Sequence, residues 1–166
     1  MKKLIAISIV LSLAITLTTT VFAQTGGLVL INPPHMDEIT AFTNDELVLA
    51  TGWGACTRGL VKAFINASTY EWYLENLPIS IAGGQDNYWG PIEFYGSSPT
   101  CLAGPGTSWG SPWRYSIGSL PAGTYEISLT TVTSHKIIDG GDYDGDGKLD
   151  FYEGGSSEVT VHVVEP

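Results

Sequence analysis

The chain has 166 residues, with 17 Asp and Glu against seven Lys and Arg, which gives a formal net charge of −10 at pH 7. This acidity argues against nucleic acid and anionic lipid as partners, because both need a basic face. The length is that of one domain of ordinary size.

The N-terminus has the features of a cleaved secretory signal peptide. Lys2 and Lys3 precede an apolar run from Leu4 to about Val21, and a cleavage site follows at Val21-Phe22-Ala23. A membrane anchor is the alternative, but serines and threonines interrupt the run. We expect residues 1–23 to be removed and the protein to be secreted or held at the cell surface, with no membrane span in the mature chain.

The predicted mature chain, residues 24–166, is expected to form a single domain. It holds all 17 acidic residues but only five basic ones, for a formal charge of −12. Its two cysteines, Cys56 and Cys101, are expected to form a disulfide, the default pairing in an exported protein. A reactive thiol pair is the alternative, but no Cys-x-x-Cys motif is present.

The first half of the mature chain predicts short strands separated by turns. Residues 28–31 are apolar and precede Asn32-Pro33-Pro34, which suits an edge strand because proline cannot donate to a ladder. Residues 60–67 are ambiguous, since one set of apolar positions fits a helix and another fits a strand; we favour the strand in these β-rich surroundings. We also expect a loop over 37–45, strands over 46–53 and 69–74, and a short return over 79–82.

Residues 83–113 form an irregular Gly/Pro/Trp-rich segment in which we expect one strand, at 92–95. The segment carries Trp89, Trp109 and Trp113. Flat aromatic rings on exposed loops can stack on sugars, so these three side chains are candidate ligand-binding residues. The alternative, which we favour, is that they cover the disulfide and fill the ends of the fold.

The last third of the chain predicts strands over 114–117, 126–133 and 159–164. Between the first two stands Leu120-Pro-Ala-Gly-Thr-Tyr125, which resembles the tyrosine corner of Greek-key sandwiches. Residues 115–164 therefore resemble the last three strands of bacterial immunoglobulin-like and fibronectin-type domains. The resemblance implies an all-β, Ig-like Greek-key β-sandwich of seven or eight strands. The Cys–Trp–Cys pin of true immunoglobulin domains is absent, although Trp72 is a candidate core tryptophan.

A candidate calcium loop spans residues 142–153, which read DYDGDGKLDFYE. Oxygen ligands at alternate positions of a tight loop suit a hard divalent cation, and a glycine at the sixth position permits the sharp turn. The predicted ligands are five carboxylates and one backbone carbonyl, that of Lys148. The carboxylates belong to Asp142, Asp144, Asp146, Asp150 and Glu153.

The surroundings of this loop indicate which kind of calcium site to expect. Gly140-Gly141 and Gly154-Gly155 flank it, and glycine disfavours the helices of a helix–loop–helix hand. The loop resembles the Asp-x-Asp-x-Asp-Gly-x-x-Asp loops inserted between strands in integrin-type propellers, with Glu153 as a further candidate ligand. The resemblance implies a Ca²⁺ ion that staples the connection between the last two strands. The competing interpretation is a solvated acidic loop.

Catalytic motifs are weak. Gly106 to Gly110 matches Gly-x-Ser-x-Gly around Ser108, but a nucleophile elbow needs a strand before the serine and a helix after it. The three histidines have no sequence-local partner for catalysis or zinc. We therefore expect a protein that is not an enzyme.

The expected role is structural or adhesive at the cell exterior, for example in a filament or envelope subunit. Residues 28–31 could pair with another chain by strand addition, so self-association or an extracellular protein partner is expected. The alternative is a carbohydrate-binding module that uses the loop tryptophans on an extracellular glycan.

Overall fold

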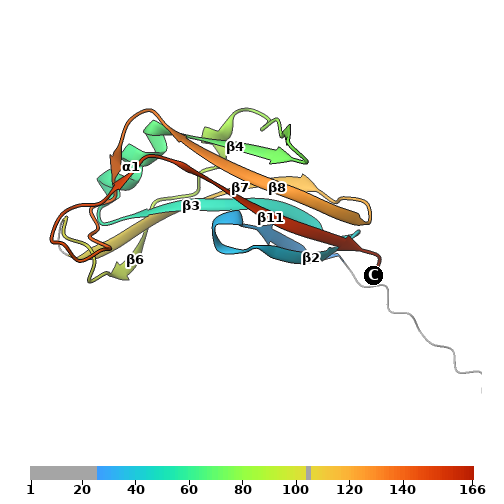
Figure 1. Ribbon diagram of the computed structural model, residues 1–166, viewed down its shortest axis with the longest axis horizontal. Coiled ribbons are helices and arrows are strands. Elements are labelled where there is room, and N and C mark those ends of the chain that lie inside the picture. Colours follow the sequence, from blue (N-terminus) through green and yellow to red (C-terminus); the bar gives the residue numbers. More distant parts are fainter. Residues whose placement is uncertain (1–25, 104–105) are drawn as a thin grey trace, which may run out of the picture.

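Two mixed β-sheets face each other across one apolar core in the computed structural model, which describes residues 26–103 and 106–166 (Figure 1). The first sheet has the order β1-β3-β7-β6 and the second the order β2-β11-β8-β4-β5. The first sheet comprises β1 (Leu28–Ile31), β3 (Glu46–Ala55), β6 (Glu93–Ser97) and β7 (Thr107–Gly118). The second comprises β2 (Glu38–Phe42), β4 (Ser68–Leu74), β5 (Leu77–Pro78), β8 (Gly123–Thr133) and β11 (Gly155–Val164). The prediction of an all-β fold is confirmed.

Alternating side chains of the long strands build the core. On β8 the inward positions are Ile127 and Leu129, and the antiparallel partner β11 contributes Val159 and Val161. Side chains of successive strand residues point to opposite faces, so this alternation buries one face of the second sheet. The first sheet contributes its own inward residues to the same cluster, among them Ile31, Leu47, Leu49 and Trp113.

A pair of tryptophans joins the two sheets. Trp72 of β4 and Trp113 of β7 stack with ring centres 5.8 Å apart and planes 17° apart, and both side chains are buried. The expected core position of Trp72 is confirmed. The contact brings two large aromatic surfaces together between the sheets.

The chain passes from the first sheet to the second near its N-terminus. Among the described strands β1 pairs only with β3, in parallel, and so is an edge strand as predicted. The short 3-10 helix η1 (Pro33–His35) then leads to β2, which pairs in parallel with β11. The expectation of a loop over 37–45 was wrong for residues 38–42. Ile39 and Ala41 alternate there with exposed residues, so this polar stretch still offers the core one apolar face.

The preference for a strand at 60–67 was also wrong, because α1 (Arg58–Ala67) is a helix. The side chain of Thr57 caps it by accepting a 3.2 Å hydrogen bond from the amide of Leu60. Val61 and Phe64, three residues apart, are both fully buried, whereas Ala63 is exposed. Helical spacing therefore accounts for the burial, and α1 covers one end of the core (Figure 1).

The irregular segment is more ordered than expected. It contains the 3-10 helix η2 (Gln85–Tyr88), strand β6 and the first half of β7, which begins at Thr107 rather than at residue 114. The return expected at 79–82 lies earlier, in β5. The chain reverses into β5 through Glu75 and Asn76, which both have positive φ angles.

The tyrosine corner is present. The hydroxyl of Tyr125 donates a 3.0 Å hydrogen bond to the backbone carbonyl of Pro121, four residues upstream.

The predicted signal peptide, residues 1–23, lies outside the described residues. Within the described ranges, no helix has the length and apolar character needed to cross a membrane.

Candidate metal loop and aromatic cleft

The candidate metal loop is closed by two very short strands. β9 (Ile137–Ile138) pairs antiparallel with β10 (Phe151–Tyr152), so residues 139–150 form the end of a small hairpin. This hairpin lies within the connection between the long strands β8 and β11. The loop is flanked by strands and not by helices, in agreement with the glycines on either side of it.

Three of the predicted ligands converge. One carboxylate oxygen each from Asp142, Asp144 and Asp146 lies within 4.8 Å of the other two. The Asp142 carboxylate also orders the turn, because it accepts hydrogen bonds from the amides of Gly145 (2.7 Å) and Gly147 (2.9 Å). Gly147 has φ = 81°, a left-handed conformation that a side chain would strain. Three exposed or half-exposed carboxylates at this separation form a group that could hold a metal ion.

The other predicted ligands have different surroundings. Asp150 accepts a 2.6 Å hydrogen bond from the amide of Tyr143, which ties the end of the loop back to its start. The ammonium of Lys148 lies 2.6 Å from a carboxylate oxygen of Asp146. Glu153 lies outside the group of three carboxylates and pairs with Lys136.

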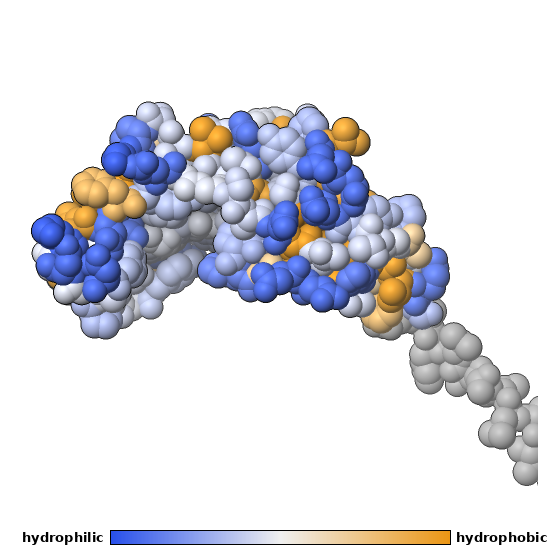
Figure 2. Space-filling view, viewed as in Figure 1, coloured by the Kyte–Doolittle hydropathy of each residue, from blue (hydrophilic) through white to orange (hydrophobic). Residues whose placement is uncertain are grey.

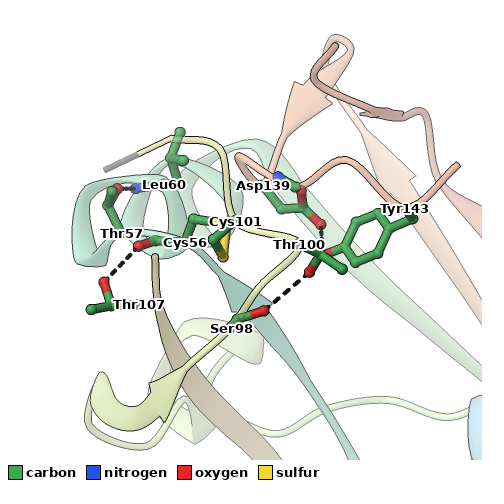
Figure 3. Close-up of a disulfide and its surroundings, with 10 residues drawn as sticks. Cys56, Thr57, Leu60, Ser98, Thr100, Cys101, Thr107, Asp139 and Tyr143 are labelled. Carbon is green, nitrogen blue, oxygen red and sulfur yellow. Dashed lines mark hydrogen bonds between the residues drawn. A yellow bond between two sulfur atoms is a disulfide. The ribbon is translucent and has the colours of Figure 1, made fainter. Parts of the chain in front are cut away.

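The disulfide between Cys56 and Cys101 forms, with Cα atoms 5.3 Å apart (Figure 3). It connects the residue after β3 to the loop that follows β6. The carbonyl of Cys56 also accepts a 3.2 Å hydrogen bond from the hydroxyl of Thr107. A disulfide of this kind indicates an oxidising compartment.

The disulfide segment directly supports the start of the metal loop. The amide of Cys56 donates to the carbonyl of Asp139 (2.7 Å), and the amide of Asp142 donates to the carbonyl of Thr100 (2.9 Å). Cys101 and Gly141 form an isolated antiparallel bridge between these hydrogen bonds. The covalent cross-link and the carboxylate group thus belong to one continuous structure.

Tyr143, within the loop, forms a hydrogen bond with the residue at the start of the loop. The hydroxyl of Tyr143 donates a 2.8 Å hydrogen bond to the carboxylate of Asp139 (Figure 3). Partial burial of the phenol, followed by the effect of Asp139, raises the pKa of Tyr143 to about 12. Tyr143 therefore stays protonated at neutral pH and remains a hydrogen-bond donor.

The three candidate tryptophans do not share one surface. Trp113 is fully buried, and its indole N–H donates to the carbonyl of Gln85 at 2.9 Å. Trp89 is half-buried and packs with its ring centre 5.4 Å from that of Tyr70. Trp109 is half-buried too, beside the exposed ring of Phe94. Only Trp109 thus lies beside an exposed aromatic ring.

The structure also contains a cleft that the sequence did not indicate. A cavity of about 310 Å³ is lined by residues of η1, β3, α1, β4, β8 and β10, and Trp53 is among them. Trp53 stacks on Phe64 with ring centres 3.9 Å apart, and Tyr152 lies 4.8 Å from Trp53. In the sequence, Trp53 stood at the end of a predicted strand and Phe64 in the ambiguous segment 60–67. Neither position indicated that the two rings would stack, so the cleft could not be predicted.

Ser108 of the Gly-x-Ser-x-Gly match lies inside β7, opposite Gly96 of β6. A nucleophile elbow would need a helix directly after Ser108, and β7 continues there instead.

His162 lies on β11, where its Nε2 is 2.8 Å from Glu38 and its Nδ1 is 3.1 Å from the hydroxyl of Thr124.

No protein-family model matches the chain, and no curated protein matches it in sequence at a significant level. Among solved structures it is similar to that of the cysteine protease inhibitor EhICP2 from Entamoeba histolytica. The TM-score is 0.36 at 9% sequence identity, over 83% of this chain and 96% of that chain. A likeness of this degree carries no inference about activity or partners.

Proposed function

We propose that the protein is a secreted, calcium-stabilised β-sandwich with a non-enzymatic structural or adhesive role at the cell exterior. The observation that supports this most is the convergence of Asp142, Asp144 and Asp146 within 4.8 Å on a loop of calcium-binding spacing. Without a cation these carboxylates repel one another, and a bound ion removes that repulsion. Asp150, Glu153 and the carbonyl of Lys148 complete the proposed ligand set.

The loop is placed where a bound ion would act as a staple. Its start is held by the Cys56–Cys101 segment, and its end leads through β10 into β11, a central strand of the second sheet. An ion in the loop therefore fixes the route of the chain between β8 and β11. Asp150 also approaches the start of the loop through Tyr143, so little rearrangement is needed to add its carboxylate.

The test is thermal and chemical unfolding of the purified chain with calcium and with a chelator. Calcium at ten times its dissociation constant should raise the free energy of unfolding by about 1.4 kcal/mol. The variant Asp142→Asn/Asp146→Asn should lose this gain. Asp37→Asn/Asp86→Asn is the matched control, because it removes the same charge from exposed positions elsewhere and should keep the gain. Equal gains in the two variants would show that calcium screens the overall charge and does not bind the loop.

The structural or adhesive part of the proposal rests on the edge strand β1. Leu28 and Leu30 on this strand are 61% and 36% exposed, and β3 is its only partner among the described strands. Unpaired edges with apolar side chains can pair with a strand of another chain. Concentration-dependent oligomers on a sizing column should be reduced by Leu30→Lys. They should be unaffected by Val132→Lys, which places the same charge on β8, whose neighbours are β11 and β4.

A carbohydrate-binding module is the second candidate function, and the observation that favours it is the half-buried Trp109 beside exposed Phe94. The test is a glycan array together with tryptophan fluorescence for wild type and Trp109→Ala. Array silence with unchanged fluorescence would exclude this function, while leaving the calcium-stabilised structural role intact.

A further inference from the structure

Three adjoining cavities share Trp53. The largest, about 310 Å³, opens between the sheets, and a second of about 270 Å³ extends past Gly52 and Gly54 towards Pro112. A third of about 150 Å³ lies against the metal loop. Figure 2 shows the molecule hollowed between the part that carries β6 and the part that carries β2. Residues from both sides, His35 and Tyr95, line the second cavity. We call these three cavities the Trp53 cleft.

Aromatic rings pack against Trp53 on one indole face and at its side. Phe64 lies parallel to Trp53 with ring centres 3.9 Å apart and so covers one face. Tyr152 is 4.8 Å from Trp53 and 6.0 Å from Phe64. These three distances place Tyr152 at the side of the stack and not over the second indole face. None of the ring contacts of Trp53 thus places an aromatic ring over the second indole face, and Trp53 lines all three cavities.

With His35 counted as neutral, the charged side chains that line the cleft are all acidic. Asp139 lines both the largest and the smallest cavity together with Trp53. Its carboxylate is fixed by hydrogen bonds from the amide of Gly141 and the hydroxyl of Tyr143, each 2.8 Å long. Asp150 lines the smallest cavity as well, but it belongs to the proposed calcium ligands. In the part of the chain that the structure describes, no lysine or arginine lines any of the three cavities.

We propose that the Trp53 cleft binds an organic cation with an alkylammonium head group. A cation over an indole face is attracted by the ring quadrupole, and the attraction grows when the site excludes water. The fixed carboxylate of Asp139 adds charge complementarity at the same place. An anion would be repelled by this surface. A neutral sugar could stack on the ring but would gain nothing from the charge. Asp142, Asp144 and Asp146 line none of the three cavities, so the proposed cation site goes beyond the proposed function and uses a different carboxylate, that of Asp139.

The test is binding to the purified chain in calcium-containing buffer, by calorimetry and by the NMR signal of the Trp53 indole N–H. Choline probes a small-molecule source of the head group, and N-acetyl-lysine methylamide probes a protein side chain. The neutral isostere 3,3-dimethylbutan-1-ol has the shape of choline without its charge, and cellobiose represents a neutral sugar. One or both cations should bind and perturb Trp53, whereas the isostere should bind about tenfold more weakly or not at all. Equal binding of choline and its isostere, binding of cellobiose alone, or no binding would each overturn the proposal.

Variants locate the site. Asp139→Asn preserves shape and should weaken cation binding about tenfold, and Trp53→Phe, with its weaker quadrupole, should weaken it about threefold. Glu93→Gln is the matched control, since it removes an exposed carboxylate from β6 that lines none of the three cavities and should change nothing. Asp144→Asn tests the metal loop and should leave cation binding intact. Loss of binding in Asp144→Asn but not in Asp139→Asn would place the cation in the loop and overturn the proposal. Unfolding curves confirm that each variant is folded.

Discussion

The backbone amide of Cys56 donates a 2.7 Å hydrogen bond to the carbonyl of Asp139, so the disulfide directly holds the residue from which the candidate metal loop departs. The amides of Leu102 and Ala103, just after Cys101, both donate to the carbonyl of Gly140 at 3.0 Å. Both halves of the cross-link therefore hold the same short segment. The same residue, Asp139, lines the Trp53 cleft, which makes it the junction between loop, disulfide and cleft.

The first prediction follows from this junction. Removing the disulfide with Cys56→Ala/Cys101→Ala should lower the free energy of unfolding by about 4 kcal/mol, in the chain-entropy estimate. It should also weaken calcium binding by about five- to tenfold, because the segment that positions Asp142 loses its covalent support. Calorimetric titration with calcium measures the second effect.

The control for this prediction is Thr107→Val. It removes the hydrogen bond that the carbonyl of Cys56 accepts from Thr107, on β7, and leaves the contacts to the loop in place. Calcium affinity should be that of wild type. An unchanged affinity in the disulfide variant as well would show that loop and cross-link are energetically independent.

The second prediction concerns α1. Phe64 is fully buried, stacks on Trp53 and helps to close one end of the core. Phe64→Ala should lower the free energy of unfolding by about 3 to 5 kcal/mol, because it removes the buried ring and leaves a cavity. Urea denaturation measures the loss. Lys62→Ala, at an exposed position of the same helix, should change stability little; an equal loss there would show that burial of the Phe64 ring is not what the substitution at residue 64 removes.

The helix also shows where sequence reasoning reaches its limit. Val61 and Phe64 fit a helical face and Val61, Ala63 and Ile65 fit a strand, so periodicity alone could not decide. The threonine at position 57, which caps the amide of Leu60 in the structure, is a helix-start signal that the prediction overlooked. The long strands could be predicted because their alternation is regular, as in β8 and β11, whereas β2 was hidden by its polar composition.

The convergence of three carboxylates in the candidate metal loop was predictable because its signal is local. Spacing placed Asp142, Asp144 and Asp146 together, and the structure brings them within 4.8 Å. The pairing of Glu153 with Lys136 was not predictable, because it depends on the β9–β10 hairpin that brings the two ends of the loop together. The Trp53 cleft was beyond the sequence for the same reason, since its walls come from segments far apart in the chain.

The third prediction tests the tyrosine corner. Tyr125→Phe removes the hydroxyl that donates to the carbonyl of Pro121 and should lower the free energy of unfolding by about 1 kcal/mol. Tyr73→Phe removes a hydroxyl that donates to the exposed carboxylate of Glu71 at 3.0 Å and should have little effect. Equilibrium denaturation of both variants makes the comparison. Equal losses of unfolding free energy in the two variants would show that the hydrogen bond of the tyrosine corner has no special effect on stability.

The fourth prediction is a pH dependence centred on Asp45. Its buried carboxylate accepts hydrogen bonds from the amides of Phe42 (2.7 Å) and Gly27 (2.6 Å), joining the turn before β3 to the N-terminal end of β1. These bonds, with that from Phe42 the stronger influence, hold the pKa of Asp45 below its ordinary value of 3.8. A pKa lowered by folding contributes stability that is fully present above the unfolded-state value. That stability is lost as the pH falls through the lower, folded-state value.

Acidification from about pH 5 to about pH 2 should therefore destabilise the wild type more than Asp45→Asn, which has no carboxylate to protonate. At neutral pH the variant should already be less stable, because an amide offers one accepting oxygen to two amide donors. Melting temperatures across this pH range measure both effects, and Asp37→Asn, an exposed aspartate before β2, should follow the wild type. Parallel curves for wild type and Asp45→Asn would show that this carboxylate contributes nothing to acid sensitivity. The loss would then have to be traced to the other carboxylates of this acidic chain.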